Sequence, residues 1–521
     1  MPTFSRYLLA LLCVLAALAG LWYSLGRDQH LAAAPQAGTR LQCTSYSPFD
    51  HDQSPFDLPL EIRRERMEAD VALLAERFDC LRTYSVTGLE ALPDIARQHG
   101  MRLMIGAWVS RDTKATREEI EGLVRTANAH PDVVEAVIVG NEALLRREIS
   151  ARRLVALIEE VKSRVAQPVT YADVWEFWLR HPQVGPAVDF VTIHLLPYWE
   201  DDPTGIDAAL AQVEKVHARF ERLYSKPIFV GETGWPSQGR QREDALPSRV
   251  NEARFIRGFI DLAEQHRWQY NLIEAFDQPW KRISEGTVGG YWGLFDAHRQ
   301  DKGILAGPVS NLPDWPRWLA VSGLLLIAGL ALAGRPHRPG ADWQLPLLTG
   351  LGAASLGLWL QQTTLDSRHL GEWLWHGALA VLNLLVAARL LLAVNPAEHG
   401  WRARLGRWLE ARAAWWLLAA GLAGAWLMLA LVFDPRYRSF PSAALLLPAL
   451  AYLLHPCRGP RTELGLLAVL LGIGLPPLLW QETLLNLQAL GWAVVALSLL
   501  LALWRSRAPS VADTCRAAAA A

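Results

Sequence analysis

The chain changes in composition near Leu312, and this change limits what it can fold into. Beyond this residue we count about seven apolar segments, each long enough to cross a membrane as a helix. A further uncharged apolar stretch, Tyr7–Gly26, lies near the N-terminus. The later segments predict an all-α membrane domain over residues 313–505, followed by a tail over residues 506–521. They lie near Trp315–Gly334, Trp343–Gln361, Glu372–Val394, Ala414–Phe433, Phe440–His455, Glu463–Trp480 and Leu484–Trp504.

The N-terminal apolar stretch has two interpretations. Arg6 precedes it, and the small residues "LAAAPQAG" from Leu31 would suit a signal peptidase. The apolar run is longer than the core of a usual signal peptide, which favours an uncleaved transmembrane anchor over residues 1–27. We therefore expect an anchor, with a cleaved signal peptide as the alternative, and then a linker over residues 28–40.

Arginine is distributed unevenly over the predicted loops of the membrane domain. Alternate loops carry about ten arginines against about three in the others, and arginine-rich loops stay in the cytoplasm. This bias predicts that both termini face the cytoplasm and that the region before Leu312 is exported. Three polar residues of the membrane segments, His376, Asn383 and Arg389, either support helix packing or mark a transport path, and we expect packing.

The exported region alternates between short apolar runs and amphipathic stretches. The runs are rich in β-branched residues, as strands are, and the stretches between them repeat at helical spacing. Thr116 and Glu119 form a capping box that is expected to open one helix. Eight strand–helix units of about 33 residues predict an α/β fold, a (β/α)8 TIM barrel over residues 41–312. A doubly wound sheet would need a glycine-rich turn after the first strand, and "CTSYSPF" is not one. The expected strands are Leu41–Tyr46, Asp79–Tyr84, Arg102–Trp108, Val134–Gly140, Val169–Asp173, Val188–His194, Ile228–Gly231 and Asn271–Phe276.

Two glutamates follow strands that face each other across such a barrel. Glu142 follows "VEAVIVGN" and Glu232 follows "PIFVG", about three strand–helix units apart. Two carboxyl groups about 5 Å apart can cleave a glycosidic bond with retention, and one of them then stays protonated near neutral pH. Asn141 and Trp235 beside them offer an amide and a flat apolar face, as a sugar site requires. The alternative for each glutamate is a salt bridge without function.

At these residues the sequence resembles glycoside hydrolase family 17, the retaining β-1,3-glucanases and glucan transglycosylases. The resemblance rests on "VGNE", "GETGWPSQG", "LPYW" and "EAFDQPWK" with "GGYWGLFD", and it covers Leu41 to about Asp301. It implies that Glu142 is the acid/base and Glu232 the nucleophile, with Asn141 on the sugar 2-hydroxyl. It is closest to bacterial and fungal forms, including bacterial membrane-anchored proteins described as β-1,6-glucan synthases. The further substrate-binding residues that it implies are Tyr46, Tyr84, Tyr198, Glu274, Asp277, Trp280, Lys281 and Trp292.

The remaining polar clusters suggest no cofactor. The sequence has no HExxH and no paired CxxC motif, so we expect no metal. Asp50–Gln53 is expected to be a solvated loop rather than a cation site. His194 either touches sugar or is a hydrogen-bonded core residue, and Asp173 is expected to be structural rather than part of the cleft. Cys43 and Cys80 begin neighbouring strands, and buried free thiols are expected, with a disulfide as the alternative.

Two functions of different classes follow. The first is a membrane-bound retaining glycoside hydrolase or transglycosylase of the bacterial inner membrane, with its catalytic domain in the periplasm, acting on β-1,3-glucan with possible β-1,6 branching. The second is a catalytically inactive carbohydrate-binding or glucan-synthesis assembly component. The expected partners are a β-glucan, the lipid bilayer and a glucan synthase. Lys+Arg 51 and Asp+Glu 52 nearly cancel, which argues against a nucleic-acid partner.

Overall fold

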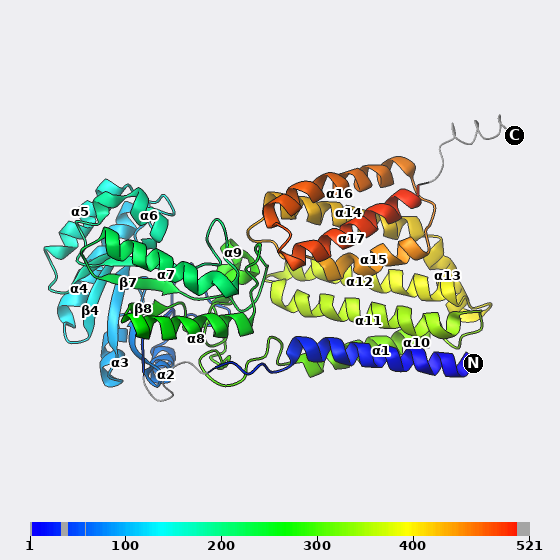
Figure 1. The fold of residues 1–521 in the computed structure, drawn as a ribbon, viewed down its shortest axis with the longest axis horizontal. Helices are drawn as coiled ribbons and strands as arrows, with labels where there is room; N and C mark the ends of the chain where they lie inside the picture. Colours follow the sequence, from blue (N-terminus) through cyan, green and yellow to red (C-terminus); the bar gives the residue numbers. More distant parts are fainter. Residues whose placement is uncertain (1–2, 33–39, 58, 508–521) are drawn as a thin grey trace. The chain divides into compact units, whose positions relative to one another are not determined.

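The computed structural model describes residues 3–32, 40–57 and 59–507. The chain divides into two compact units (Figure 1). The barrel unit comprises Gln29–Gln238 and Asp244–Val309, and the helical unit comprises Met1–Asp28, Gly239–Glu243 and Ser310–Ala521. Most of the predicted linker and of the predicted C-terminal tail falls at residues 33–39 and 508–521, outside the described residues.

Eight parallel strands of the barrel unit close into a barrel in chain order, which confirms the predicted fold class. Because every strand runs the same way, the carboxyl ends of all strands meet at one rim. The strands are β1 Leu41–Ser45, β2 Phe78–Arg82, β3 Arg102–Ala107, β4 Val134–Asn141, β5 Val169–Val174, β6 Val191–Leu195, β7 Ile228–Thr233 and β8 Gln269–Leu272.

Amphipathic helices surround the strands and bury their apolar faces against them (Figure 1). The capping box prediction is wrong: α4 begins at Thr113, and its N-cap is Asp112, whose side chain accepts from the backbone N–H groups of Lys114 and Ala115. These helices are α2 Arg64–Ala75, α3 Leu92–Gln98, α4 Thr113–Ala129, α5 Ala151–Lys162, α6 Trp175–Arg180, α7 Ile206–Leu223, α8 Arg249–His266 and α9 Arg282–Gly289, with 3-10 turns η1 Pro182–Val184 and η2 Pro279–Lys281.

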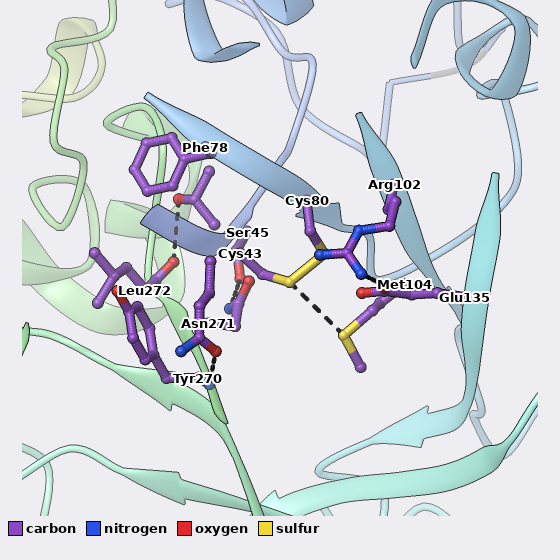
Figure 2. The surroundings of a disulfide bond; sticks show 12 residues. Cys43, Ser45, Phe78, Cys80, Arg102, Met104, Glu135, Tyr270, Asn271 and Leu272 are labelled. Carbon is purple, nitrogen blue, oxygen red and sulfur yellow. Dashed lines mark hydrogen bonds and ion pairs between the residues drawn. A yellow bond between two sulfur atoms is a disulfide. The ribbon is translucent and has the colours of Figure 1, made fainter. Parts of the chain in front are cut away.

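The inside of the barrel is a small core of its own, and it contains a disulfide. Cys43 of β1 and Cys80 of β2 are direct partners in the strand register, and their sulfurs are bonded (Figure 2). The Met104 sulfur lies 3.9 Å from the Cys43 sulfur. The expectation of free thiols is therefore wrong, because parallel pairing brings the two Cα atoms to 4.3 Å of each other. Sequence spacing alone does not reveal this register.

The last strand ends earlier than predicted. β8 stops at Leu272, whereas Asn271–Phe276 was the expected strand. Beyond Leu272 the backbone N–H groups leave the regular ladder, since Glu274 donates to the Trp292 carbonyl and Ala275 to the Ser45 carbonyl. Glu274 therefore lies on an irregular segment at the rim, where its side chain can reach the inside of the barrel mouth.

The helical unit contains the predicted apolar segments as helices. Six helices of the described residues are long and apolar enough to cross a membrane, which is compatible with a membrane protein. These six are α1, α10, α12, α14, α16 and α17. The helices of this unit are α1 Thr3–Gly26, α10 Trp315–Ala333, α11 Ala341–Asp366, α12 Leu370–Val394, α13 Gly400–Glu410, α14 Ala413–Phe433, α15 Ser442–Leu454, α16 Arg461–Glu482 and α17 Leu487–Arg505.

The polar residues inside the helical unit have packing partners. Asn383 donates to the Leu379 and Ala444 carbonyls, the latter on α15. Arg389 pairs with Glu410 and donates to the His455 carbonyl. His376 lies 2.7 Å from the Ser367 hydroxyl. These contacts support the packing interpretation of the three residues over a transport path.

Candidate active site

The two glutamates singled out in the sequence meet at the carboxyl rim of the barrel. Glu232 lies in β7, and Glu142 directly follows β4. His194 of β6 lies between them, with Nδ1 2.8 Å from Glu142 Oε1 and 3.7 Å from Glu232 Oε2. One oxygen of each carboxylate and a ring nitrogen of His194 all lie within 4.8 Å of one another. A single sugar unit can therefore contact both carboxyl groups at once.

Glu232 is buried and surrounded by positive charge. The Arg82 guanidinium, itself fully buried, donates through Nη1 to Glu232 Oε1 at 3.0 Å and to the Gly231 carbonyl at 2.8 Å. Burial alone would raise the pKa of Glu232, but His194, Arg82 and Lys281 outweigh it and hold that pKa below its ordinary value. The Glu232 carboxylate is therefore ionised and fixed in place, as a nucleophile requires.

Glu142 has a different environment from Glu232. Its side chain is 22% exposed, against 6% for Glu232. Its backbone has a φ of 52°, in the left-handed region, and its N–H donates to the Ala172 carbonyl of β5 at 2.8 Å. Asn141, just before it, accepts a hydrogen bond from Arg82 through Oδ1. One arginine thus orders both Glu232 and the residue beside Glu142.

The residues after β8 divide into two groups. Glu274 accepts from Lys281 Nζ at 2.7 Å, and its other oxygen has no hydrogen-bond partner. Burial raises the pKa of Glu274, and the neighbouring Lys281 opposes this shift. Asp277 is not part of this pair: it accepts from the Gly293 N–H and from Lys302 beneath the rim. Glu274 and Lys281 of the predicted cluster thus contact each other directly, whereas Asp277 acts on Glu274 only through its charge.

Aromatic side chains from the segments that follow β6 and β8 pack against one another. Trp292 stacks on Trp199, with ring centroids 6.1 Å apart, and its indole N–H has no hydrogen-bond partner. Tyr198 packs edge-on against both rings. Trp280 is partly buried and donates to Gln278. The half-buried Tyr84 donates to Ser45 Oγ at 3.0 Å, and its hydroxyl helps to lower the pKa of Glu232.

Two of the predicted sugar-binding residues are buried aromatics with partners in the barrel, and their role stays a prediction. The Tyr46 ring is buried on the outside of the strands, and its hydroxyl donates to Asp70 of α2. Trp235 is fully buried, packs against Phe255 of α8 and donates to the Leu246 carbonyl. Both aromatics follow a strand end. Successive side chains of an extended segment point to opposite faces, so a shift of one residue turns a side chain from the cleft to the core.

Sequence reasoning missed Arg82 and undervalued His194. Arg82 ends β2 in "FDCLR", and an arginine at the end of an apolar strand was a usable signal, because a buried cation requires a buried anion. The sequence allows His194 to touch sugar or to be a hydrogen-bonded core residue, and the structure places its ring between the two carboxylates.

The same three side chains carry donor atoms of the kind that bind metal ions. Glu142, His194 and Glu232 bring suitable donor atoms within 4.8 Å, while the second such group among the described residues includes the disulfide-bonded Cys43 and Cys80. Arg82 and Lys281 already supply positive charge to Glu232, which disfavours a cation at this position. The chemistry of the donor set fits paired acid and nucleophile better than a metal centre.

The barrel unit is a closed (β/α)8 barrel with one carboxylate after β4 and one in β7. This arrangement is typical of glycoside hydrolases with a barrel fold. Residues 43–293 match the family model of the BtgE/BtgC glycoside hydrolase domain, which identifies the barrel unit as a glycoside hydrolase domain.

Curated relatives have the same domain. The "Probable beta-glucosidase btgE" of Aspergillus flavus is 28% identical over 243 residues, which are 45% of this chain and 39% of that protein. The "Glucan 1,3-beta-glucosidase BGL2" of Candida albicans is 26% identical over 263 residues, which are 44% of this chain and 83% of that protein. The crystal structure of a glycoside hydrolase family 17 β-1,3-glucanosyltransferase from Rhizomucor miehei has 25% sequence identity and a TM-score of 0.45, covering 51% of this chain and 97% of that chain.

Proposed function

We propose that this protein is a membrane-bound glycoside hydrolase or glucanosyltransferase that cleaves β-1,3-glucan by double displacement. The observation that carries the proposal is the close approach of Glu142 and Glu232, whose oxygens lie within 4.8 Å. A separation near 5 Å leaves room for a covalent glycosyl-enzyme but not for a water molecule between base and sugar. The similarity to the glucan 1,3-beta-glucosidases of Candida albicans and Saccharomyces cerevisiae supports a β-1,3-glucan as the substrate.

In the first step Glu232 attacks the anomeric carbon of the sugar. The glycosidic C–O bond breaks, Glu142 gives its proton to the leaving oxygen, and a glucosyl ester forms on Glu232. Arg82 keeps Glu232 ionised and oriented before the attack. Lys281 with Glu274, and the unpartnered Trp292 indole N–H, face the same rim and are proposed to bind sugar hydroxyls, together with Asn141, Tyr84, Tyr198 and Trp280.

In the second step Glu142 takes a proton from an incoming hydroxyl, and that oxygen attacks the anomeric carbon and releases Glu232. Water gives hydrolysis, and a sugar hydroxyl gives transfer. We propose transfer, with a 6-hydroxyl acceptor producing β-1,6 branches. We also place the barrel on the periplasmic side of a bacterial inner membrane, near a glucan synthase, because the apolar helices and the arginine bias of the loops support an exported barrel.

The test uses the full chain purified in detergent with laminari-oligosaccharides as the substrate. We expect wild type and the exposed control Glu118→Gln to form products, and Glu232→Ala and Glu142→Gln to lose at least about 99% of the rate. A 2-deoxy-2-fluoro-laminaribiosyl fluoride should label the peptide that contains Glu232. Mass spectrometry of products longer than the substrate would establish transfer.

Each other outcome has a defined meaning. Equal product formation by wild type and by the glutamate variants would overturn the enzymatic proposal. Oligosaccharide binding without turnover by wild type would support the alternative function, an inactive carbohydrate-binding component. Products that are only shorter than the substrate would exclude transfer and leave hydrolysis.

A further inference from the structure

The turn that carries Glu142 has an unusual backbone. Glu142 has a φ of 52° and Arg147 a φ of 55°, both in the left-handed region that non-glycine residues rarely occupy. Such a conformation is strained for a non-glycine residue and persists only where the surroundings enforce it. The position of the proposed acid/base therefore depends on contacts that hold residues 142–148.

One set of contacts is made by Arg146 of the turn, with the end of β4 and with the segment that follows β3. Arg146 donates through Nη1 to the Asn141 carbonyl and through Nη2 to the Val109 carbonyl at 3.1 Å. Its guanidinium also lies 4.1 Å from the centroid of the Trp108 ring. These contacts close the turn on itself on the side of the third strand.

A second set of contacts comes from β5 and involves two buried side chains. The Tyr171 hydroxyl accepts from the Leu144 N–H at 2.9 Å and donates to Asp173 Oδ2. Asp173 Oδ2 also accepts from the Leu145 N–H at 3.4 Å, and its Oδ1 accepts from the Val174 N–H at 2.8 Å. The tyrosine and the aspartate thus hold the backbone N–H groups of Leu144 and Leu145, two and three residues after Glu142.

We propose that Tyr171 and Asp173 are positioning residues for the acid/base Glu142, and that they hold its turn so that the carboxyl group delivers a proton to the leaving oxygen. This inference rests on the proposed function. It assigns the pair a role in acid catalysis by Glu142 and none in nucleophilic attack by Glu232. The pair does not contact Glu232, whose partners come from β2 and β6. Loss of the pair should therefore leave the nucleophile intact.

The charges around Asp173 fit this role. It faces Glu142 of the neighbouring turn, His194 of β6 and Tyr171 of its own strand. Burial, and then the negative charge of Glu142, raise the pKa of Asp173 to about 7. Asp173 is therefore partly protonated near neutral pH, which weakens its repulsion of negative charge on the neighbouring turn.

Proton donation matters only when the leaving group is poor, and this separates positioning from general structural support. The test compares Tyr171→Phe and Asp173→Asn with wild type, all as the full chain in detergent. The substrates are a laminari-oligosaccharide, with a sugar leaving group, and 2,4-dinitrophenyl β-laminaribioside, whose leaving group needs no proton. The value of kcat/KM reports the first chemical step for both substrates.

We expect kcat/KM on the oligosaccharide to fall about 10- to 100-fold in each variant, less than the roughly 10²- to 10⁴-fold value of complete acid catalysis. On the dinitrophenyl substrate it should stay within about twofold of wild type. KM should change little, and Glu142→Gln should show the same pattern more strongly. The matched control is Asp189→Asn, since Asp189 accepts from the Val169 N–H at the opposite end of β5.

Three results would overturn the inference while leaving the proposed function standing. They are an equal loss on both substrates, an unchanged rate on the oligosaccharide, and the same selective loss in Asp189→Asn. Tyr171→Phe removes a single oxygen and Asp173→Asn keeps the side-chain shape, so at least one folded variant is expected, checked by circular dichroism. A wild type inactive on both substrates would instead overturn the proposed function.

Discussion

At the residue scale, a single buried arginine organises the candidate site. Arg82 contacts Glu232 and Asn141 at once and has no access to solvent. A buried cation is tolerated only with a charged partner and good hydrogen bonds, and Glu232 together with two carbonyl-type acceptors supplies them. The charge of Arg82 also lowers the pKa of the proposed nucleophile.

Replacement of this arginine should change the pH dependence of the reaction. In Arg82→Met the positive neighbour is lost, so the pKa of Glu232 rises and a larger fraction is protonated at acidic pH. The acidic limb of kcat/KM should therefore move upward by about one pH unit or more, with a lower maximum. The measurement is kcat/KM on laminari-oligosaccharides between pH 4 and 8.

The control for this prediction is Arg102→Met, because Arg102 is exposed and begins β3 at the opposite end of the barrel. Its profile should match that of wild type. A profile of Arg82→Met with an unmoved acidic limb would show that Arg82 does not set the ionisation of Glu232.

The sequence predicts the location of a residue when its position along a strand is enough to place it at the rim of the barrel. Glu142 and Glu232 follow or end apolar runs, and the parallel topology then brings them to one rim. Tyr46 and Trp235 also follow strands, but the direction of their side chains depends on the backbone conformation at the strand end. No local sequence pattern shows that conformation. Arg82 was missed because arginine is normally exposed and a single sequence does not reveal its buried partners.

At the element scale, the N-terminus of α8 lies over a buried charge cluster. Lys302 Nζ lies 3.2 Å from Glu252 of α8, 3.1 Å from Asp277 and 2.9 Å from Ser237 Oγ. Two carboxyl groups therefore share one ammonium group. Burial raises the pKa of Glu252 to about 8, with Asp277 adding to the rise and Lys302 opposing it.

This cluster predicts a pH-dependent stability. The pKa of Glu252 in the folded chain lies above its ordinary value of 4.5, so the folded state binds a proton that the unfolded chain releases. Its stabilising contribution is complete below about pH 4.5 and is lost as pH rises toward 8. In Glu252→Gln the fall in the free energy of unfolding between pH 5 and 8 should shrink by up to about 4 kcal/mol.

Thermal or urea unfolding of the full chain at several pH values measures this difference. The control is Glu264→Gln, an exposed position on the same helix, which should keep the wild-type pH dependence. If Glu252→Gln falls in stability as steeply as wild type, Glu252 is not the titrating group.

The barrel strands and their order could be predicted because each strand carries its own apolar pattern and the connections repeat. The ends of elements were harder. Asp112 caps α4 in place of the expected Thr116, because Thr116 instead accepts from the Ser110 N–H and Glu119 accepts from Ser85 and Thr87. Both members of the predicted capping box thus form hydrogen bonds with residues outside the helix instead of capping it.

The disulfide between β1 and β2 gives a separate prediction. It closes a segment of 37 residues, and its loss is expected to cost about 3–4 kcal/mol of the free energy of unfolding by the chain-entropy argument. Peptide mapping of the unreduced, alkylated chain should find the Cys43 and Cys80 peptides linked. A Cys43→Ala, Cys80→Ala double variant should unfold at lower denaturant, and free thiols at both positions in wild type would contradict the bond.

At the scale of the whole molecule, a soluble-type barrel and apolar helices occur in one chain. The composition change near Leu312 made this division predictable. α11 and α15 are not among the candidate spans: α11 has 26 residues but lower hydropathy, and α15 has only 13 residues. Segment counting along the sequence cannot decide whether such helices cross a bilayer, since neighbouring helices can bury their polar groups.

The proposed topology is testable with reporter fusions in bacteria. A green fluorescent protein after residue 521 should fluoresce, because the arginine-rich loops predict a cytoplasmic C-terminus. Alkaline phosphatase fused after Leu312 should be active, because the barrel is predicted to be exported. The opposite pair of results would reverse the orientation, and release of the chain from membranes by alkaline carbonate would exclude an integral membrane protein.

The sulfur–sulfur bond in the middle of the barrel bears on where this enzyme matures. Cross-links of this kind persist in oxidising surroundings and are rare where glutathione keeps thiols reduced. Because Cys43 and Cys80 are sealed inside the closed strands, they must be joined while the polypeptide is still open. Barrel that folds in the cytoplasm would keep both cysteines as thiols. The redox state of this pair therefore reports on which side of the membrane each molecule folded.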